Sequence, residues 1–229
     1  MATSKEKLII IGEGETGEIA YEYFTQDTNF EVVAFSAEKK FMKNQTLFGL
    51  PVIALEELEK AFNPQDCTVF VAVSFTELNR VRARLLRIAK EKGFRACSYI
   101  SPKAFIGKGV DIGENCFILE NVAIQRSSKI GNNVTIWTGS SVAHHSVIGD
   151  NCFIASHVAI SGFCNVGDYC FLGVNSCMID KIRIAKDTII GAGAVVIQNT
   201  ETGRIYVGNP AKPLPNKSVE PFIGNVTMI

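Results

Sequence analysis

Residues 146–173 read SVIGDNCFIASHVAISGFCNVGDYCFLG, and in this stretch an aliphatic residue returns at every sixth position. These aliphatic residues are Ile148, Ile154, Ile160, Val166 and Leu172. The step of six runs without interruption from Ile106 to Val196, and all sixteen positions of this series are aliphatic. An α-helix repeats near every 3.6 residues and a single strand every two, so neither of them explains a period of six.

A second series, two positions before the first, holds small or β-branched residues. Its members are Ala104, Val110, Cys116, Val122, Ser128, Val134, Ser140, Ser146, Cys152, Val158, Cys164, Cys170, Ser176, Ile182, Thr188 and Ala194. Six residues make one short strand and a corner, and three such units close a triangular coil in which both series point inward and stack coil on coil. The pattern therefore predicts a parallel β-helix over residues 104–199. The four cysteines of the inward series are predicted to be core residues rather than ligands or nucleophiles.

The first hundred residues alternate between strand-like and helix-like segments. Strands are predicted at residues 7–12, 30–36, 67–74 and 95–101, and helices at residues 16–27, 55–62 and 78–93. This alternation predicts a small parallel α/β sheet. Pro102 marks the transition to the repeat. The predicted domains are therefore an α/β domain at 1–101, a β-helix at 102–200 and a C-terminal tail at 201–229.

The segment Gly12-Glu13-Gly14-Glu15-Thr16-Gly17 has a GxGxxG pattern between the first predicted strand and the first predicted helix. Such a loop can present backbone N–H groups and a helix N-terminus to a diphosphate. A nicotinamide dinucleotide is disfavoured, because the second strand ends Phe35-Ser36-Ala37 without the acidic residue that such a cofactor requires. A tight turn with a purely structural role is the alternative.

All three histidines of the chain, His144, His145 and His157, fall in the repeat. Gly162 follows His144 by one coil, and stacked coils lie about 4.8 Å apart, so its amide is expected within reach of a group bound beside His144. Acyl transfer uses a base beside a backbone donor, since the base takes the proton of the acceptor and the donor stabilises the tetrahedral oxyanion. His144, His145 and Gly162 are therefore the candidate catalytic residues.

A metal site is the alternative use of these histidines. His157 belongs to another corner of the coil, and a strand of roughly five residues separates corners by about 16 Å, too far for a shared ion within one chain. Contact between neighbouring subunits could still bring the histidines together. No metal is predicted, and a polar corner residue without a chemical role is the favoured interpretation of His157 and an alternative for His144.

The composition excludes several classes of function. A hydrophobic fraction of 47% and a charged fraction of 20% are typical of a globular protein with a real core. Lys plus Arg equals Asp plus Glu at 23, so no basic surface suggests nucleic acid. No apolar run is long enough to span a bilayer. Seven cysteines without a CxxC pair, after a polar start, predict reduced thiols and a cytoplasmic protein without a signal peptide.

The chain resembles the sugar acyltransferases of the PglD/NeuD type. Four segments carry the resemblance most specifically: SVAHHSVIG at 141–149, CFLGVNSC at 170–177, IIGAGAVV at 189–196 and YVGNPAK at 206–212. The resemblance covers nearly the whole sequence and implies that the β-helix is left-handed, whereas physics alone favours right-handed crossovers. It also implies a homotrimer with active sites between subunits.

The resemblance assigns roles to residues at matching positions. The histidine matching His144 is the catalytic base, and the glycine matching Gly162 donates its amide to the thioester carbonyl. The implied coenzyme A site consists of Gly162, Gly191, Ala192, Ala194, Pro210 and Lys212. The implied site for a nucleotide-linked sugar consists of Gly12, Gly14, Glu15, Thr16, Ser36, Ser74 and Phe75. The family usually has Asp or Glu where this chain has His145, and an acidic residue after the second strand where this chain has Ser36-Ala37.

The leading hypothesis is an acetyl-CoA-dependent N-acetyltransferase that acts on the amino group of a nucleotide-linked amino sugar for bacterial surface glycan or glycoprotein biosynthesis. His144 would remove the proton of the attacking nitrogen, and Gly162 would stabilise the oxyanion. One alternative is O-acetylation of a sugar hydroxyl. The other is a β-helix without catalytic activity that serves in binding or assembly, which intact Gly162 and Gly191–Ala194 disfavour.

Overall fold

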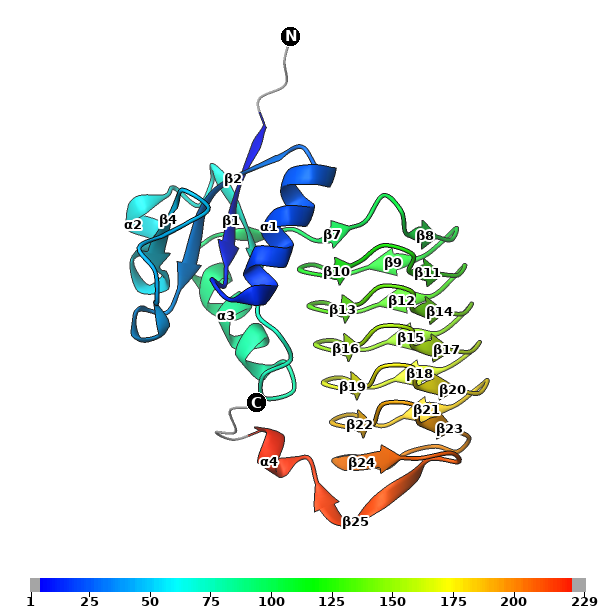
Figure 1. Cartoon of the computed structure of the whole chain (residues 1–229). Coiled ribbons are helices and arrows are strands. Elements are labelled where there is room, and N and C mark those ends of the chain that lie inside the picture. Colours follow the sequence, from blue (N-terminus) through cyan, green and yellow to red (C-terminus); the bar gives the residue numbers. More distant parts are fainter. Residues whose placement is uncertain (1–4, 224–229) are drawn as a thin grey trace. The chain divides into compact units, whose positions relative to one another are not determined.

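The computed structural model describes residues 5–223 of the 229-residue chain. The chain forms two compact units (Figure 1). The α/β unit comprises the residues up to Ser74 together with Arg82–Ser98, and the β-helix unit comprises Phe75–Val81 together with the residues from Tyr99 onward. Residues 1–4 of the predicted α/β domain and residues 224–229 of the predicted tail lie outside the described residues.

The α/β unit contains the predicted parallel sheet. Its strands are β1 (Glu6–Ile11), β2 (Phe30–Ala37), β3 (Thr46–Leu47), β4 (Leu50–Ala54), β5 (Cys67–Val71) and β6 (Arg95–Ala96). They are ordered β3-β4-β2-β1-β5-β6, and all neighbours are parallel except the β3–β4 hairpin. Leu8, Ile9, Ile10 and Ile11 of β1 are completely buried, as expected for a central strand that is covered on both faces.

The helices are α1 (Glu15–Asp27), α2 (Leu58–Ala61) and α3 (Arg80–Glu91), with 3₁₀ turns η1 (Lys39–Phe41) and η2 (Leu55–Glu57). The predicted helix at 55–62 is therefore a 3₁₀ turn followed by a single α-helical turn. The predicted strand at 95–101 is two strands, because β6 joins the α/β sheet while β7 (Tyr99–Ile100) pairs with a strand of the β-helix. The β3–β4 hairpin was not predicted, since two residues are too few to show a period.

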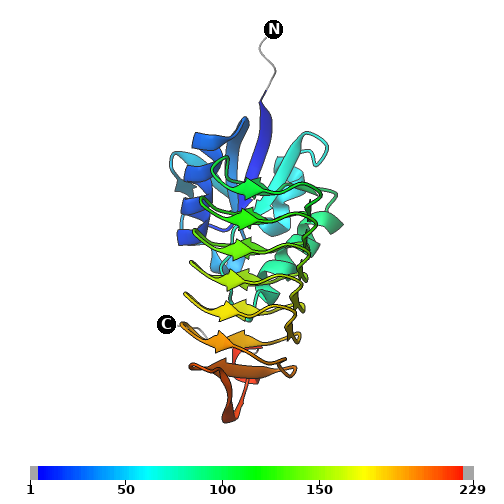
Figure 2. The same cartoon turned by 90° about the vertical axis from the view of Figure 1, so that its right-hand side faces the viewer.

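The β-helix unit is a left-handed parallel β-helix whose short strands stack in three sheets (Figures 1 and 2). The first sheet holds β7, β10 (Phe117–Ile118), β13 (Thr135–Ile136), β16 (Phe153–Ile154), β19 (Phe171–Leu172), β22 (Ile189–Ile190), β24 (Arg204–Val207) and β25 (Lys212–Ser218). The second holds β8 (Phe105–Ile106), β11 (Ala123–Ile124), β14 (Ser141–Val142), β17 (Ala159–Ile160), β20 (Cys177–Met178) and β23 (Val195–Val196). The third holds β9 (Asp111–Ile112), β12 (Lys129–Ile130), β15 (Val147–Ile148), β18 (Asn165–Val166) and β21 (Arg183–Ile184).

The core of the β-helix is built from the two series found in the sequence. From Ile118 to Val196 no member of the aliphatic series is more than 4% exposed, whereas Ile106 in the first coil is 36% exposed. Cys116, Cys152, Cys164 and Cys170 are buried in the same core, which confirms their predicted packing role. Burial raises the pKa of the Cys152 and Cys164 thiols, which keeps them protonated and unreactive.

From Gly109 to Gly193, each corner places one residue in the left-handed backbone region. At the corner between the second and third sheets, Gly109, Ser127, His145, Phe163 and Lys181 have φ angles between 56° and 72°. Non-glycine residues adopt this conformation only at some cost, and here stacked coils hold them in it, since His145 N–H donates to the Arg126 carbonyl at 3.1 Å. The corners therefore fix the direction in which their side chains leave the backbone.

The predicted C-terminal tail is partly regular. β24 extends the first sheet in parallel with β22, and β25 pairs antiparallel with β24 before the short helix α4 (Glu220–Ile223). The antiparallel turn ends the stack of parallel coils and covers the edge of β24. No helix among the described residues is both long and apolar enough to cross a membrane.

Candidate active site

His144 lies at the corner between β14 and β15 and is half-buried. Hydrogen bonds of its backbone hold it in place. Its N–H donates to Gln125 Oε1 at 3.2 Å, and its carbonyl accepts a hydrogen bond from Phe163 N–H at 3.0 Å. Gln125 belongs to the coil before and Phe163 to the coil after. The histidine backbone is therefore fixed from both neighbouring coils.

The side chains of His144 and His145 contact each other. Their Nδ1 atoms are 3.2 Å apart, and the two rings are nearly perpendicular at 81°. The exposed ring of His145 stacks on Phe163, with 4.9 Å between centroids and an interplanar angle of 12°. Phe163 was not predicted as a site residue, although its place one coil after His145 could have indicated it.

A contact of this length between two Nδ1 atoms is a hydrogen bond in which one ring donates and the other accepts. When His144 Nδ1–H donates to His145 Nδ1, the Nε2 atom of His144 carries a free lone pair and can act as a base. His145 then fixes the tautomer of His144, as a carboxylate would do, but it supplies no negative charge. In this tautomer the pair can provide an oriented base.

The imidazole of His144 lies against Gly162 of the next coil. A Cβ atom at Gly162 would come within 2.8 Å of His144 Cε1 and 3.1 Å of Nε2, so only a hydrogen atom fits there. The amide of Gly162, predicted as the donor to the thioester carbonyl, donates to Asp180 Oδ1 at 2.8 Å. Asp180 occupies the same corner one coil further on and was not predicted to take part.

Apart from Gly162, which lies beside His144, the residues assigned to coenzyme A lie on the last coil and the turn after it. Gly191 N–H donates to the Tyr206 carbonyl at 2.8 Å, and Val195 N–H donates to the Gly208 carbonyl at 3.0 Å, so both segments are hydrogen-bonded together. Ala192, Pro210 and Lys212 are exposed. Ala194 is completely buried, and its side chain belongs to the β-helix core rather than to an open surface.

Most residues assigned to the nucleotide-linked sugar meet at one edge of the α/β sheet. Gly12 and Gly14 lie in the loop after β1, Glu15 and Thr16 begin α1, and β1 lies between β2 and β5. Ser36 is the last residue but one of β2, and Ser74 comes three residues after the end of β5. Ligands of open α/β sheets bind at the carboxyl ends of strands where the strand order reverses, which is the position of this loop.

Phe75 differs from the other residues assigned to the sugar. It belongs to the β-helix unit, where its ring packs against Phe153 and Phe171 with centroid distances of 5.0 and 4.9 Å. These rings come from β16 and β19, so Phe75 is part of an aromatic cluster on the first sheet. Ser74 and Phe75, neighbours in sequence, thus fall into different units.

The three glycines of the loop have different roles. A Cβ atom at Gly12 would clash with the Ala72 carbonyl, and one at Gly17 with the Gly12 carbonyl, so both are required by close backbone packing. Gly14 faces open space, with nothing within 4 Å of a Cβ placed there. The absence of a side chain at Gly14 therefore leaves room for a ligand before the N-terminus of α1.

Two acidic residues near this loop were not predicted. Glu13 accepts hydrogen bonds from the amides of Lys43 and Asn44 at 2.5 and 3.1 Å, which ties the loop to the segment before β3. β2 runs to Ala37, so an acidic residue, Glu38, does follow it, which corrects the sequence interpretation. Arg84 binds Glu38 with two contacts of 2.8 Å, and this hydrogen bonding lowers the pKa of Glu38.

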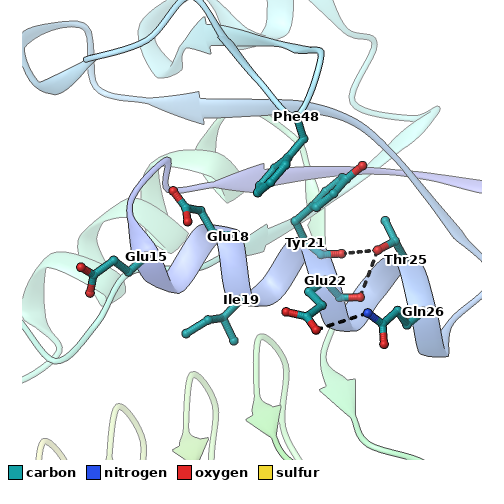
Figure 3. Close-up of a pocket in the computed structure, with 8 residues that line it drawn as sticks. All are labelled: Glu15, Glu18, Ile19, Tyr21, Glu22, Thr25, Gln26 and Phe48. Carbon is teal, nitrogen blue, oxygen red and sulfur yellow. Dashed lines mark hydrogen bonds between the residues drawn. The ribbon is translucent and has the colours of Figure 1, made fainter.

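A cavity of about 580 Å³ lies along α1 (Figure 3). Its lining residues are Glu15, Glu18, Ile19, Tyr21, Glu22, Thr25, Gln26 and Phe48. The Tyr21 and Phe48 rings stack at 4.6 Å, while three carboxylates line the same hollow. This charge disfavours a diphosphate, so the cavity is not the candidate nucleotide site, although it includes Glu15.

His157 lies at a different corner from the histidine pair, where its ring covers Gly139. Among residues 5–223, no three or more His, Cys, Asp or Glu side chains are grouped so that they could hold a metal ion. The arrangement of the site is that of an oriented base beside a backbone amide.

Two protein-family models match the repeat. The bacterial transferase hexapeptide model matches residues 127–162, and the model of the hexapeptide repeat of succinyl-transferase matches residues 165–198. Together with the left-handed β-helix and the histidine corner, these matches define the class of the protein as a hexapeptide-repeat acyltransferase.

Three solved structures show which members of this class the chain is similar to. A variant of perosamine N-acetyltransferase from Caulobacter crescentus, in complex with CoA and GDP-perosamine, is 30% identical, with 92% of this chain and 97% of that chain covered and a TM-score of 0.80. The acetyltransferase domain of PglB from Neisseria gonorrhoeae is 25% identical (91% and 100% covered, TM-score 0.81). WeeI from Acinetobacter baumannii is 26% identical (90% and 99% covered, TM-score 0.77). The chain belongs to the sugar N-acetyltransferases of the PglD/NeuD type.

The contact between the two histidines predicts graded effects of substitution at His145. Replacing His145 by alanine removes the hydrogen bond that fixes the His144 tautomer, and we expect turnover to fall about tenfold, less than for loss of the base itself. Replacing His145 by glutamate adds a negative charge that favours protonated His144, so the acid limb of the pH profile of kcat/KM should move to higher pH. A steady-state pH series measures both effects, and an unmoved acid limb in the glutamate variant would contradict the contact.

Proposed function

We propose that the protein transfers the acetyl group of acetyl-CoA to the amino group of a nucleotide-linked amino sugar. The observation that carries this proposal is the His144 imidazole, oriented by His145 and lying against Gly162. Similarity supports the substrate class, because the Caulobacter enzyme that is 30% identical was crystallised with CoA and GDP-perosamine. Nucleotide-linked amino sugars of this kind feed the synthesis of bacterial surface glycans and glycoproteins.

The proposed reaction begins when the amine nitrogen attacks the thioester carbonyl carbon. His144 Nε2 removes a proton from the nitrogen as it becomes cationic, while Nδ1–H of the same ring keeps its hydrogen bond to His145. The carbonyl oxygen becomes an oxyanion that the amide of Gly162 stabilises. The carbon–sulfur bond then breaks, and the departing thiolate takes the proton from His144 to give coenzyme A and the N-acetylated sugar.

We assign the nucleotide to the carboxyl edge of the α/β sheet and coenzyme A to the last coil. Gly14 leaves open space before α1, and the buried hydroxyl of Ser36 has no hydrogen-bond partner within the described part of the chain, so both can receive a ligand. The exposed surface assigned to coenzyme A is bordered by Gly191, Ala192, Pro210 and Lys212.

We also propose a cytoplasmic location. The seven cysteines are all free, and thiols stay reduced in the cytoplasm.

The direct test is a substrate panel read by mass spectrometry. The protein is incubated with acetyl-CoA and a set of nucleotide-linked amino sugars, each paired with the sugar that carries a hydroxyl in place of the amine. We expect one acetyl group to be added to at least one amino sugar and not to its hydroxyl counterpart. Acetylation of the hydroxyl sugars alone would replace the proposal with O-acetylation, and no product with any acceptor would favour the non-catalytic module.

We also propose a homotrimer with sites between subunits. The β-helix unit exposes Phe163, Val174, Ile179 and Ile197 by between 42% and 51%. Exposed apolar side chains of this size are available for burial against a neighbouring subunit. Phe163 belongs to the histidine corner, so a neighbouring subunit bound there would add a second wall to the site. Light scattering should give a mass of three times 25.0 kDa. A monomer at micromolar concentration would contradict the shared site.

A further inference from the structure

The amide of Gly162 has a hydrogen-bond partner before any acyl donor binds. Its N–H donates to Asp180 Oδ1 at 2.8 Å, and the His144 imidazole lies against the same glycine. In the proposed reaction this amide stabilises the oxyanion, so one N–H group has two competing acceptors. The two acceptors are the Asp180 carboxylate and the carbonyl oxygen of the thioester.

The same kind of contact recurs elsewhere in the β-helix as a structural device. At the corner between the third and first sheets, Asn132 N–H donates to Asp150 Oδ1 at 2.6 Å and Asp150 N–H donates to Asp168 Oδ1 at 2.9 Å. In each case a side-chain oxygen caps the amide one coil earlier. Asp180 differs in one respect, because the amide that it caps lies beside a histidine pair. Asp168 therefore offers a matched comparison without that neighbour.

We propose that Asp180 is a positioning residue that holds the amide of Gly162 until the acyl group displaces it, and that it thereby limits how strongly the enzyme prefers acetyl-CoA to CoA. This inference rests on the proposed function. A hydrogen bond to a carboxylate is stronger than one to a neutral carbonyl. The thioester carbonyl therefore gains little from this amide in the ground state, and the thiol of CoA, which has no carbonyl, leaves the contact with Asp180 intact.

The contact has a different effect on the transition state. When the carbonyl oxygen becomes an oxyanion, its charge equals that of the carboxylate, and the amide can exchange one anion for the other. Asp180 is exposed, so the displaced carboxylate can turn into water at small cost. Because the amide leaves Asp180 only when the oxyanion forms, its bond to the acyl oxygen contributes to turnover rather than to substrate affinity, and the loss of the Asp180 contact offsets part of this contribution.

The test compares the affinities of acetyl-CoA and CoA by calorimetry, for the wild type and for Asp180→Ala. The measured quantity is the ratio of the two dissociation constants. Removing the carboxylate frees the amide for the thioester carbonyl, so we expect the preference for acetyl-CoA over CoA to increase about tenfold, the value of one hydrogen bond between an amide and a neutral carbonyl. An unchanged or smaller preference in Asp180→Ala overturns the inference.

Two further variants separate this role from a structural one. Asp168→Ala removes the matched contact at the other corner, and it should lower the melting temperature as Asp180→Ala does while leaving the preference for acetyl-CoA at the wild-type value. Asp180→Asn keeps an oxygen acceptor without the charge, so the preference should lie between the wild type and the alanine variant. An equal rise in both alanine variants would assign the effect to general loosening of the coil and overturn the inference.

The same measurements distinguish failure of the inference from failure of the proposed function. If the wild type binds both ligands and only the Asp180 variants behave otherwise than expected, the inference is wrong and the proposed acetyl transfer stands. If the wild type binds neither ligand at millimolar concentration, the proposed function falls and the inference falls with it.

Discussion

Replacing His144 by alanine is expected to lower turnover by about two to four orders of magnitude, the usual contribution of a general base. The imidazole is the proposed base, and its Nε2 atom lies against Gly162, where the thioester carbonyl is proposed to bind. Since this ring serves the acceptor rather than the donor, the affinity for coenzyme A should hardly change. Steady-state kinetics with saturating acetyl-CoA and calorimetry with coenzyme A separate the two effects.

His157→Ala is the matched control for this prediction. His157 is also a corner histidine, but it lies at another corner and is exposed, and its left-handed backbone (φ 58°) matches that of His145 rather than that of His144. Its removal should leave turnover within about twofold of the wild type, since surface substitutions outside special sites have small effects. Full activity in His144→Ala would mean that the base is elsewhere or that the substrate amine needs none.

The second large effect is expected for Gly162→Ala, at about a hundredfold loss of turnover or more. The added methyl group would lie 2.8 Å from His144 Cε1, so the imidazole must move away from the amide that is proposed to stabilise the oxyanion. Misplacement of a catalytic group by about 1 Å can cost a factor of this size. Gly162 does not have a positive φ angle, so alanine is compatible with its backbone and the β-helix should still fold.

A double-mutant cycle tests this reason for the loss. If Gly162→Ala acts by displacing the imidazole, it should cost little in a protein that already carries His144→Ala, because residues that act as a unit are not additive. Thermal melts of all four proteins show whether the fold is retained. Additive losses would mean that the methyl group acts on the donor site directly and not through His144.

Several features of the α/β unit depended on tertiary structure. The GxGxxG pattern predicted a glycine-rich turn, but only packing distinguishes Gly12, which is pressed against the Ala72 carbonyl, from Gly14, which faces open space. The acidic residue after β2 was missed, although Glu38 follows directly at the end of this strand. Whether Glu38 faces a ligand or a protein cation depends on Arg84, which is 46 positions away in the sequence.

What the sequence alone determined was the β-helix and the vertical neighbours at its corners. The six-residue period is a local, repeated property, and three repeats return the chain to the same corner, so the position of Gly162 one coil after His144 follows from counting. The left hand of the coil came from the resemblance, because the period is compatible with either hand.

Only the tertiary structure decided which atoms of these neighbours meet. The rotamers of His144 and His145 bring their Nδ1 atoms to 3.2 Å, and Phe163 from the next coil holds the second ring by stacking. Several oxygen atoms near the Gly162 amide could accept its hydrogen bond, and the one that does so is Asp180 Oδ1. A period fixes where the backbone goes, whereas side-chain contacts and hydrogen-bond partners depend on all the neighbours that surround each group at once.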